Sequence, residues 1–205
     1  MTCVFLAELK RKMKKIKEPF GLLLLFLCMF SFTSCDNDAP KFSSTQILQA
    51  LFDMKGTYHA TVRVSYYQGD EIAELTDAVA VSRDSLSFTM SLLPMAESIE
   101  DESVSQLLRE VGEVTVTAGY DFSRMDGGNI NFGLCPKEVI IPGGYPLPPT
   151  VRIVIAQNYG GDVAIRKDFK NFLMFNVSPI ELWLNGKKYE DFKPLVYHFE
   201  GRVSE

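Results

Sequence analysis

The chain has 205 residues, of which 46% are hydrophobic and 23% charged, and its formal net charge is −5. Six Lys or Arg and two Glu give residues 1–34 a net charge of +4, which leaves −9 on residues 35–205. Nucleic-acid binding requires a basic patch, so we expect no nucleic acid among the partners. A charge of −9 also argues against adhesion to anionic lipid by electrostatics alone.

The N-terminus has the order of a signal peptide. Basic residues between Lys10 and Lys17 precede an apolar run over residues 20–30, and small residues then lead to Cys35. The run has 11 residues, whereas a membrane-spanning helix needs about 20. An uncleaved membrane helix is the alternative, but polar residues begin immediately at Asp36. We therefore predict an exported precursor that is cleaved before Cys35.

The segment Phe32-Thr33-Ser34-Cys35 resembles the lipobox of bacterial lipoprotein precursors, although Leu is more usual than Phe at its first position. The resemblance implies that the Cys35 sulfur receives a diacylglycerol and that the amino group freed by cleavage is acylated. Two or more acyl chains suffice for stable anchoring. We thus expect a signal peptide over 1–34, a lipidated Cys35 with a tether over 35–44, and one globular domain over 45–205.

The mature chain as a whole resembles the uncharacterised lipoprotein families of Bacteroides-type bacteria. This resemblance implies an outer-membrane protein and assigns no catalytic residue. Asp36-Asn37-Asp38 is similar to the acidic signature of surface-exposed lipoproteins in these bacteria, and an ordinary solvated linker has the same composition. The side of the membrane on which the domain lies stays open.

Two helices are expected in the domain. Residues 45–54 follow a candidate cap at Ser44, and Ile47, Leu48, Leu51 and Phe52 fall on one helical face. Residues 99–111 follow Ser98 as a candidate cap, carry acidic residues in the first turn and end at Gly112. Calcium binding by this acidic run would need further oxygen ligands from elsewhere in the chain.

Most of the remaining sequence alternates with the period of a β-strand, beginning with 57–67. Met125-Asp126-Gly127-Gly128 and Asn185-Gly186 predict hairpins, the second as a type I′ turn. The fold class is therefore mainly β, an antiparallel barrel or sandwich with one or two short helices. Gly56-Thr57-Tyr58 is similar to the Gly-x-Trp opening of lipocalin-like barrels, with Tyr in the place of Trp.

In a barrel of about eight strands the interior either fills with side chains or holds one small ligand. The alternation predicts an inward set made mostly of medium-sized aliphatic residues, and an ordinary two-layer core would have the same composition. The inward set is Val62, Val64, Val79, Val81, Phe88, Val114, Val116, Ile153, Ile155, Leu182 and Leu184.

Catalytic motifs are absent from the sequence, so we predict a protein that is not an enzyme and has no cofactor. The only histidines, His59 and His198, would approach each other if the first and last strands paired, but a metal site would still lack a third ligand. We expect two partly exposed strand histidines and no metal. Cys3 and Cys28 leave with the signal peptide, so Cys135 has no disulfide partner and reads as a small buried apolar residue rather than a nucleophile.

Two surface features complete the candidate sites. Asp84-Ser85-Leu86 is similar to the short O-glycosylation motif of Bacteroides-type bacteria, which makes Ser85 a candidate acceptor. Glycan-binding surfaces present aromatic platforms, and packing within the domain is the more ordinary role for such residues. The candidates are Tyr66, Tyr67, Tyr145, Tyr159 and Trp183.

The favoured function is a lipid-anchored, non-catalytic binding or accessory protein of the envelope. Its partner besides the membrane would be a small apolar ligand, a glycan or another envelope protein. The alternatives are a structural or interaction subunit without a ligand pocket, and a hydrolase that uses paired carboxylates.

Overall fold

The computed structural model describes residues 42–126, 128–142, 150–160, 162–167 and 170–203, with the backbone alone at 77–79, 81, 165–167 and 170. The expected signal peptide, Cys35 and its tether up to residue 41 lie outside the described residues. The described part of the chain is mainly β, as predicted, with a few short helices.

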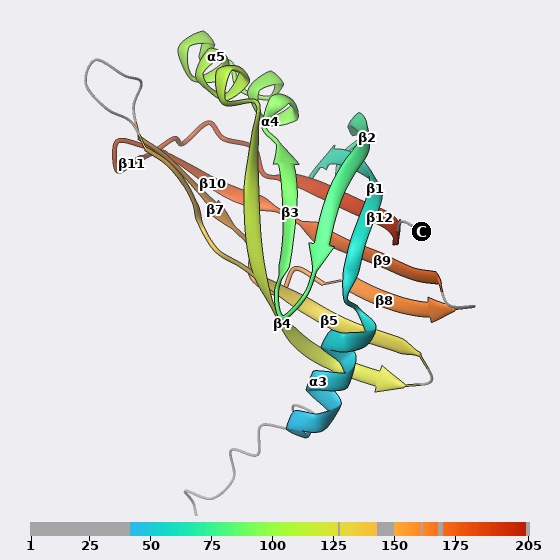
Figure 1. The fold of residues 1–205 in the computed structure, drawn as a ribbon. Coiled ribbons are helices and arrows are strands. Elements are labelled where there is room, and N and C mark those ends of the chain that lie inside the picture. The colour runs from blue at the N-terminus through green and yellow to red at the C-terminus, as the bar shows by residue number, and fades with distance from the viewer. Residues whose placement is uncertain (1–41, 127, 143–149, 161, 168–169, 204–205) are drawn as a thin grey trace, which may run out of the picture. The chain divides into compact units, whose positions relative to one another are not determined.

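Eight antiparallel strands follow one another around a barrel (Figure 1). Each pairs with its neighbour, and the last strand pairs with the first, so the hydrogen-bonding cycle closes. Closure is uneven, because β2 pairs with β3 only over Ala80–Ser82 and β5 with β8 only over Asn129–Phe132. The barrel strands are β1 (Gly56–Tyr66), β2 (Glu71–Ser82), β3 (Leu86–Ser91), β4 (Glu113–Asp126), β5 (Asn129–Pro136), β8 (Asp162–Lys167), β9 (Lys170–Val177) and β12 (Leu195–Val203).

Two insertions into this meander build a second, four-stranded sheet. One insertion lies between β5 and β8 and the other between β9 and β12, and they join through the antiparallel pair β7–β10. Only Ser178 separates β9 from β10, so the second sheet continues strands of the barrel. Its strands are β6 (Val139–Ile141), β7 (Val151–Ile155), β10 (Pro179–Leu184) and β11 (Lys187–Lys188).

The helices lie at opposite ends of the barrel (Figure 1). Helix α3 (Ser44–Asp53) precedes β1, whereas α4 (Leu93–Glu97) and α5 (Glu102–Val111) connect β3 to β4. The predicted caps are each wrong by one to three residues. Ser43 caps α3 through a capping box with Gln46. Asp101 caps α5, because the unpredicted helix α4 uses Ser98 as its own C-terminal cap.

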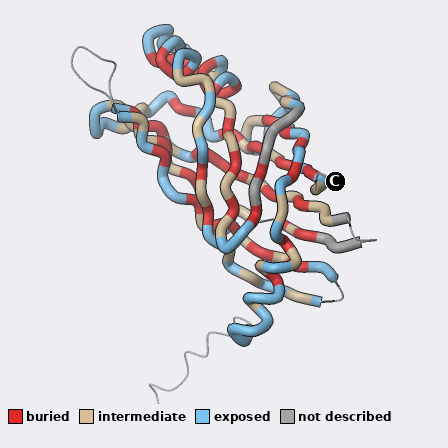
Figure 2. Tube along the Cα trace, viewed as in Figure 1, coloured by how far each residue is buried: buried red, intermediate tan, exposed pale blue. Residues whose placement is uncertain are grey.

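The stripe that predicted α3 is not its buried face. Ala50 is the buried residue of this helix, while Leu48 is 66% and Phe52 70% exposed. The outer side of α3 is correspondingly exposed along its length (Figure 2). The apolar periodicity therefore located the helix correctly and gave no indication of which face the domain would cover.

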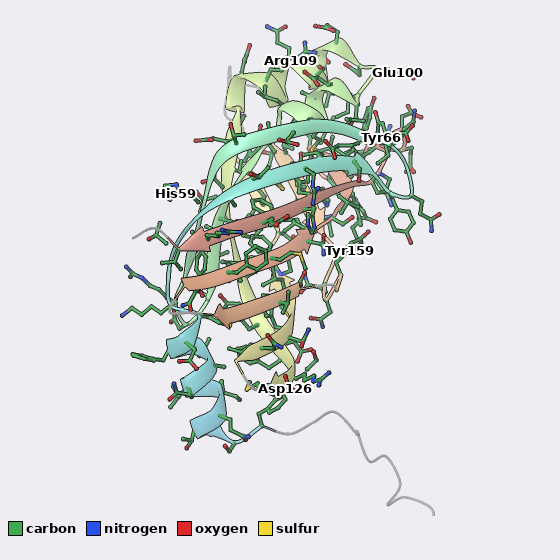
Figure 3. All side chains as sticks on the ribbon, turned by 90° about the vertical axis from the view of Figure 1, so that its right-hand side faces the viewer. His59, Tyr66, Glu100, Arg109, Asp126 and Tyr159 are labelled. Carbon is green, nitrogen blue, oxygen red and sulfur yellow. The ribbon has the colours of Figure 1, made fainter. Side chains whose placement is uncertain are left out.

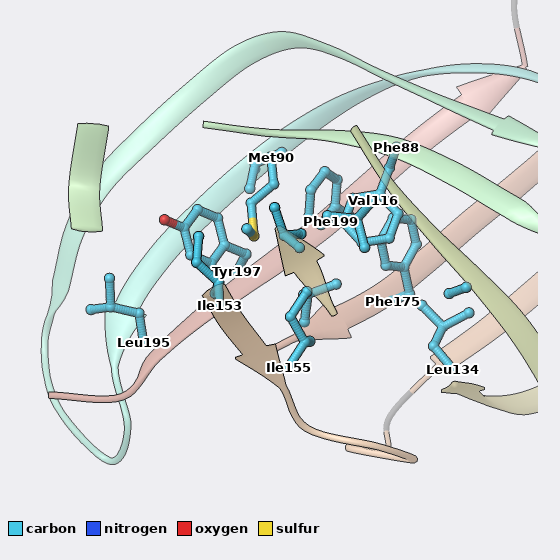
Figure 4. Packing of buried hydrophobic residues seen from close by; sticks show 14 of the residues in the cluster. Phe88, Met90, Val116, Leu134, Ile153, Ile155, Phe175, Leu195, Tyr197 and Phe199 are labelled. Atoms are coloured by element: carbon cyan, nitrogen blue, oxygen red, sulfur yellow. The ribbon is translucent and has the colours of Figure 1, made fainter. Parts of the chain in front are cut away.

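Large aromatic side chains fill the barrel (Figure 4). Phe175 and Phe199 stack with ring centroids 4.5 Å apart, and Phe88 packs on both at 5.1 Å. Ile153 and Ile155 of β7 belong to the same buried cluster, so the second sheet contributes to the barrel core. The interior is thus occupied by side chains, including aromatic rings from strands whose inward residues were not in the predicted set.

Most of the predicted inward set is buried, and its remaining members are partly buried or not described. Val114 and Leu184 are partly buried, and the side chains of Val79 and Val81 lie outside the described residues. The fully buried members are Val62, Val64, Phe88, Val116, Ile153, Ile155 and Leu182.

The Asn185-Gly186 turn has the predicted geometry. It joins β10 to β11 at the pair Leu184–Lys187, and both turn residues have positive φ, 51° at Asn185 and 77° at Gly186. The type I′ turn requires this left-handed backbone, which β-branched residues resist.

Replacing Gly186 with Val is expected to lower the free energy of unfolding by about 1–3 kcal/mol, because a β-branched residue is strained at this φ. The matched control is Gly119→Val in β4, where an added Cβ meets no atom within 4 Å and φ is ordinary. Chemical denaturation measures both. Equal stabilities for the two variants would contradict the turn assignment.

Candidate functional site

A cleft of about 240 Å³ lies between α3 and the adjoining end of the barrel. Its lining comes from α3, the start of β1, the β4–β5 hairpin, β8 and β9. Asp126, in that hairpin, lies at the same end of the molecule as α3 (Figure 3). The cleft is open on one side and is therefore distinct from the filled interior of the barrel.

Two hydrogen bonds hold the C-terminal end of α3 over this cleft. The Tyr58 hydroxyl donates to the Met54 carbonyl at 2.6 Å, and Asn171 Nδ2 donates to the Asp53 carbonyl at 2.6 Å. Carbonyls at a helix C-terminus have no partner within the helix, so both bonds satisfy groups that burial would otherwise penalise. Burial raises the pKa of Tyr58 to about 12, which keeps its hydroxyl protonated as a donor.

The cleft combines an apolar floor with a polar rim. Apolar side chains on the floor come from the helix and from four strands, and the rim carries carboxamides and two carboxylates. This combination is typical of small-molecule sites, although 240 Å³ lies just below their usual lower limit of about 300 Å³. The floor is Ala50, Met54, Tyr58, Met125, Ile130 and Ala164, and the rim is Gln46, Gln49, Asp53, Asp126, Asn129 and Asn171.

Both rim carboxylates are engaged by neighbouring donors. Asp53 Oδ1 accepts from Gln49 Nε2 at 2.9 Å, and Asp126 Oδ2 accepts from Arg124 Nε at 2.7 Å. Among the lining residues that the structure describes, none beside them is His, Cys, Ser or Lys. The described lining thus offers apolar contacts together with carboxamide and carboxylate groups.

Asp162 is a buried carboxylate on the side of the barrel where β5 and β8 separate. It is 2% exposed, and its Oδ1 accepts from the Asn176 backbone N–H at 2.8 Å, whereas its Oδ2 has no hydrogen-bond partner among the described residues. Burial raises its pKa to about 7, against the opposing effect of backbone N–H groups from Asn176 and Leu134. The carboxylate accepts from the Asn176 N–H, which lies beyond the last β8–β9 residue pair, Val163–Met174. This hydrogen bond requires a carboxylate to be buried, which disfavours its charged form.

Cys135 lies beside this region. Its predicted burial is wrong, because the residue is partly exposed, and its lack of a nucleophilic role stays a prediction. It is a free, partly exposed cysteine whose thiol approaches Asn158 Oδ1 at 3.4 Å. Burial, followed by the charge of Asp121, raises its pKa, which disfavours the reactive thiolate.

The first and last strands pair, but this pairing does not bring the histidines together. His59 lies opposite Arg202, and His198 lies opposite Arg63. His59 is exposed on the outer surface (Figure 3), and His198 Nδ1 lies 2.8 Å from Asn176 Oδ1. Within the described ranges no three His, Cys, Asp or Glu residues gather as metal ligands.

The aromatic candidates divide between packing and exposure. Arg152 lies over the Trp183 ring, 4.3 Å from its centroid, and Trp183 Nε1 donates to Glu181, so this ring is already covered. Tyr67 is 57% exposed, whereas Tyr66 and Tyr159 are partly buried. Tyr145 lies outside the described residues. Tyr67 is thus the most accessible of the described tyrosines in the set.

Ser85 lies in the turn between β2 and β3, where its carbonyl accepts from the Arg83 N–H at 3.2 Å. Its side chain is partly exposed. Cys35, the predicted lipidation site, lies outside the described residues.

Among the helices that the structure describes, none has the length and apolarity to cross a membrane. Comparisons of the chain with protein-family models, curated proteins and solved structures return no match.

Neither the cleft nor Asp162 was predicted from the sequence. The cleft joins three regions that are distant in the chain, namely α3 with β1, the β4–β5 hairpin, and β8 with β9, and no local pattern marks them. Asp162 follows two glycines at the start of a strand, where an acidic residue ordinarily belongs to an exposed turn. Its burial results from the separation of β5 and β8, which is a tertiary feature.

Asp162→Asn is expected to change how stability depends on pH. The pKa is about 7 in the fold and about 4 in the unfolded chain, so the wild-type protein loses stability as pH rises from about 4 to about 7. Asn keeps the acceptor without the charge. The variant should therefore gain stability relative to wild type across that window, up to about 2–4 kcal/mol above pH 7.

Denaturation at several pH values measures this effect. Asp162→Ala is the control, because it removes the charge together with the acceptor for Asn176 and should be destabilised at low pH. Parallel pH profiles for wild type and Asp162→Asn would contradict the raised pKa.

Proposed function

We propose that the chain is a lipid-anchored, non-catalytic binding protein of a bacterial outer membrane, resembling the lipoproteins of Bacteroides-type bacteria. Residues 1–34 direct export and are removed, and Cys35 carries the lipid. The domain binds a small ligand in the cleft beneath α3, with the apolar part of the ligand on the floor and its polar end at the carboxamide rim.

The observation that carries the binding role is the combination of a filled barrel and an open cleft at its end. Phe88, Phe175 and Phe199 pack on one another and occupy part of the barrel interior. The cleft retains apolar surface together with hydrogen-bonding groups that are not part of a catalytic set. This distribution favours recognition at the barrel end.

Cys35→Ala is expected to abolish metabolic labelling with palmitate, because the acceptor sulfur is lost. The matched control is Cys135→Ala, which removes the other cysteine of the mature chain and should leave labelling unchanged. Labelling followed by immunoprecipitation distinguishes the two variants. Persistent labelling of the Cys35→Ala protein would contradict the anchor.

The cleft is tested with 1-aminonaphthalene, a small apolar fluorophore with one polar group. Met125→Trp places a bulky ring in the cleft and should weaken saturable binding at least about tenfold, which corresponds to about 1.4 kcal/mol. The matched control is Met174→Trp on the outer face of β9, a partly exposed position outside the cleft, which should bind as wild type does. Absence of saturable binding to the wild-type protein would favour a structural or interaction subunit.

A further inference from the structure

The outer face of α3 carries an apolar patch that the fold leaves uncovered. We define this α3 patch as Leu48, Leu51 and Phe52, which lie three and four positions apart and so share one side of the helix. Leu48 is 66% and Phe52 70% exposed, and Leu51 is partly exposed. Exposing large apolar side chains on two successive turns is unfavourable in water and indicates a contact surface.

The opposite side of the same helix packs on the barrel and lines the cleft. Ala50 is 3% exposed against the barrel, and Gln46, Gln49 and Asp53 line the cleft. The α3 patch therefore cannot turn inward without removing the cleft and the bonds that Tyr58 and Asn171 make to the helix C-terminus. Helix α3 is therefore amphipathic in the reverse of the usual orientation, because its more apolar side faces away from the barrel.

Cations border the α3 patch. Lys55, one turn beyond Leu51, and Arg83, from the β2–β3 turn, line a shallow open hollow together with Leu48, Leu51 and Phe52. Asp84 is the acidic residue in that lining. Apolar side chains flanked by Lys and Arg suit the boundary between acyl chains and headgroups, because the long cationic side chains reach the headgroups while the apolar residues enter the acyl region.

The tether determines which surface meets the α3 patch. Eight residue steps separate Cys35 from the helix cap Ser43, and a chain of that length spans at most about 28 Å. The lipid on Cys35 would hold α3 close to the bilayer for as long as the protein is anchored. The effective concentration of lipid surface at this helix would then far exceed that of any freely diffusing partner.

We propose that the α3 patch docks on the lipid bilayer, with Leu48 and Phe52 inserted among the acyl chains near the headgroups. The inference rests on the proposed anchor at Cys35. Docking gives the anchored domain a fixed orientation, in which α3 lies between the bilayer and the cleft.

The test uses a single tryptophan as a reporter of lipid contact. Trp183 is the only tryptophan, so Trp183→Phe provides the background and Phe52→Trp places the reporter in the α3 patch. Lipidated protein is purified and reconstituted into phosphatidylcholine vesicles with or without bromine on the acyl chains. Bromine quenches tryptophan only on close approach, so Phe52→Trp should lose more than half of its emission in brominated vesicles.

Two matched controls sharpen the test. Ile140→Trp in the same background reports from another exposed position, 62% exposed on β6, and should stay unquenched. Adding Leu48→Asp to the Phe52→Trp protein should reduce the quenching at least twofold, whereas Leu93→Asp on α4 should not. Both leucines are exposed, so folding is expected to persist, and neither is in the cleft lining, so ligand binding is expected to persist as well.

Vesicle flotation measures whether the protein is attached to the bilayer at all, so it distinguishes a failure of the proposed docking from a failure of the proposed anchor. Protein that floats with the vesicles but shows no quenching at position 52 would overturn the docking and leave the anchor intact. Protein that does not float would overturn the anchor and the docking together. Emission that shifts to the blue with protein concentration and shows no quenching would assign the α3 patch to a second copy of the chain, which also overturns the docking.

Discussion

Strands β1 and β12, the first and last of the fold, pair without interruption from Tyr58–Val203 to Tyr66–Leu195. This pairing closes the barrel and leaves neither strand with a free edge. It demands close approach, because a Cβ at Gly201 would lie 3.0 Å from the Ala60 Cβ and from the His59 carbonyl oxygen. Closure also places α3, which leads directly into β1, across the barrel end. Without the pairing of β1 with β12, α3 would not cover this end of the barrel and the cleft beneath it would not form.

Local features were predicted well from the sequence because their causes are local. Asn185-Gly186 adopts its turn through the backbone freedom of two residues, and Gly112 ends α5 at a φ of 74°. Features that depend on the meeting of distant segments were not predicted. The outward direction of Leu48 and Phe52 is one such feature, since the barrel covers only the side of the helix that carries Ala50. The second sheet is another, because it requires two insertions to pair through β7 and β10.

Apolar side chains of the domain occupy three different kinds of environment. Aromatic rings fill the barrel, smaller side chains make the floor of the cleft, and the outward side of α3 stays exposed. The first arrangement supplies stability through packing. The other two place apolar surface at the end of the barrel where α3 lies, and Leu93, Ile140 and Ile180 expose apolar side chains elsewhere. Recognition and anchoring, as proposed, would therefore share one end of the molecule, away from α4, α5 and the second sheet.

The position of β1 between two partners has a mechanical consequence. In the proposed anchored state, a pull from the lipid would pass through α3, whose C-terminal end accepts the Asn171 bond, and would then load β1 along its own axis. Nine residue pairs with β12 and nine with β2 would resist that load together, in shear, rather than opening one at a time as a peeled strand does. A lipid-held protein that is dragged by flow or by a bound partner would thus transmit force through the part of its sheet that is best suited to bear it.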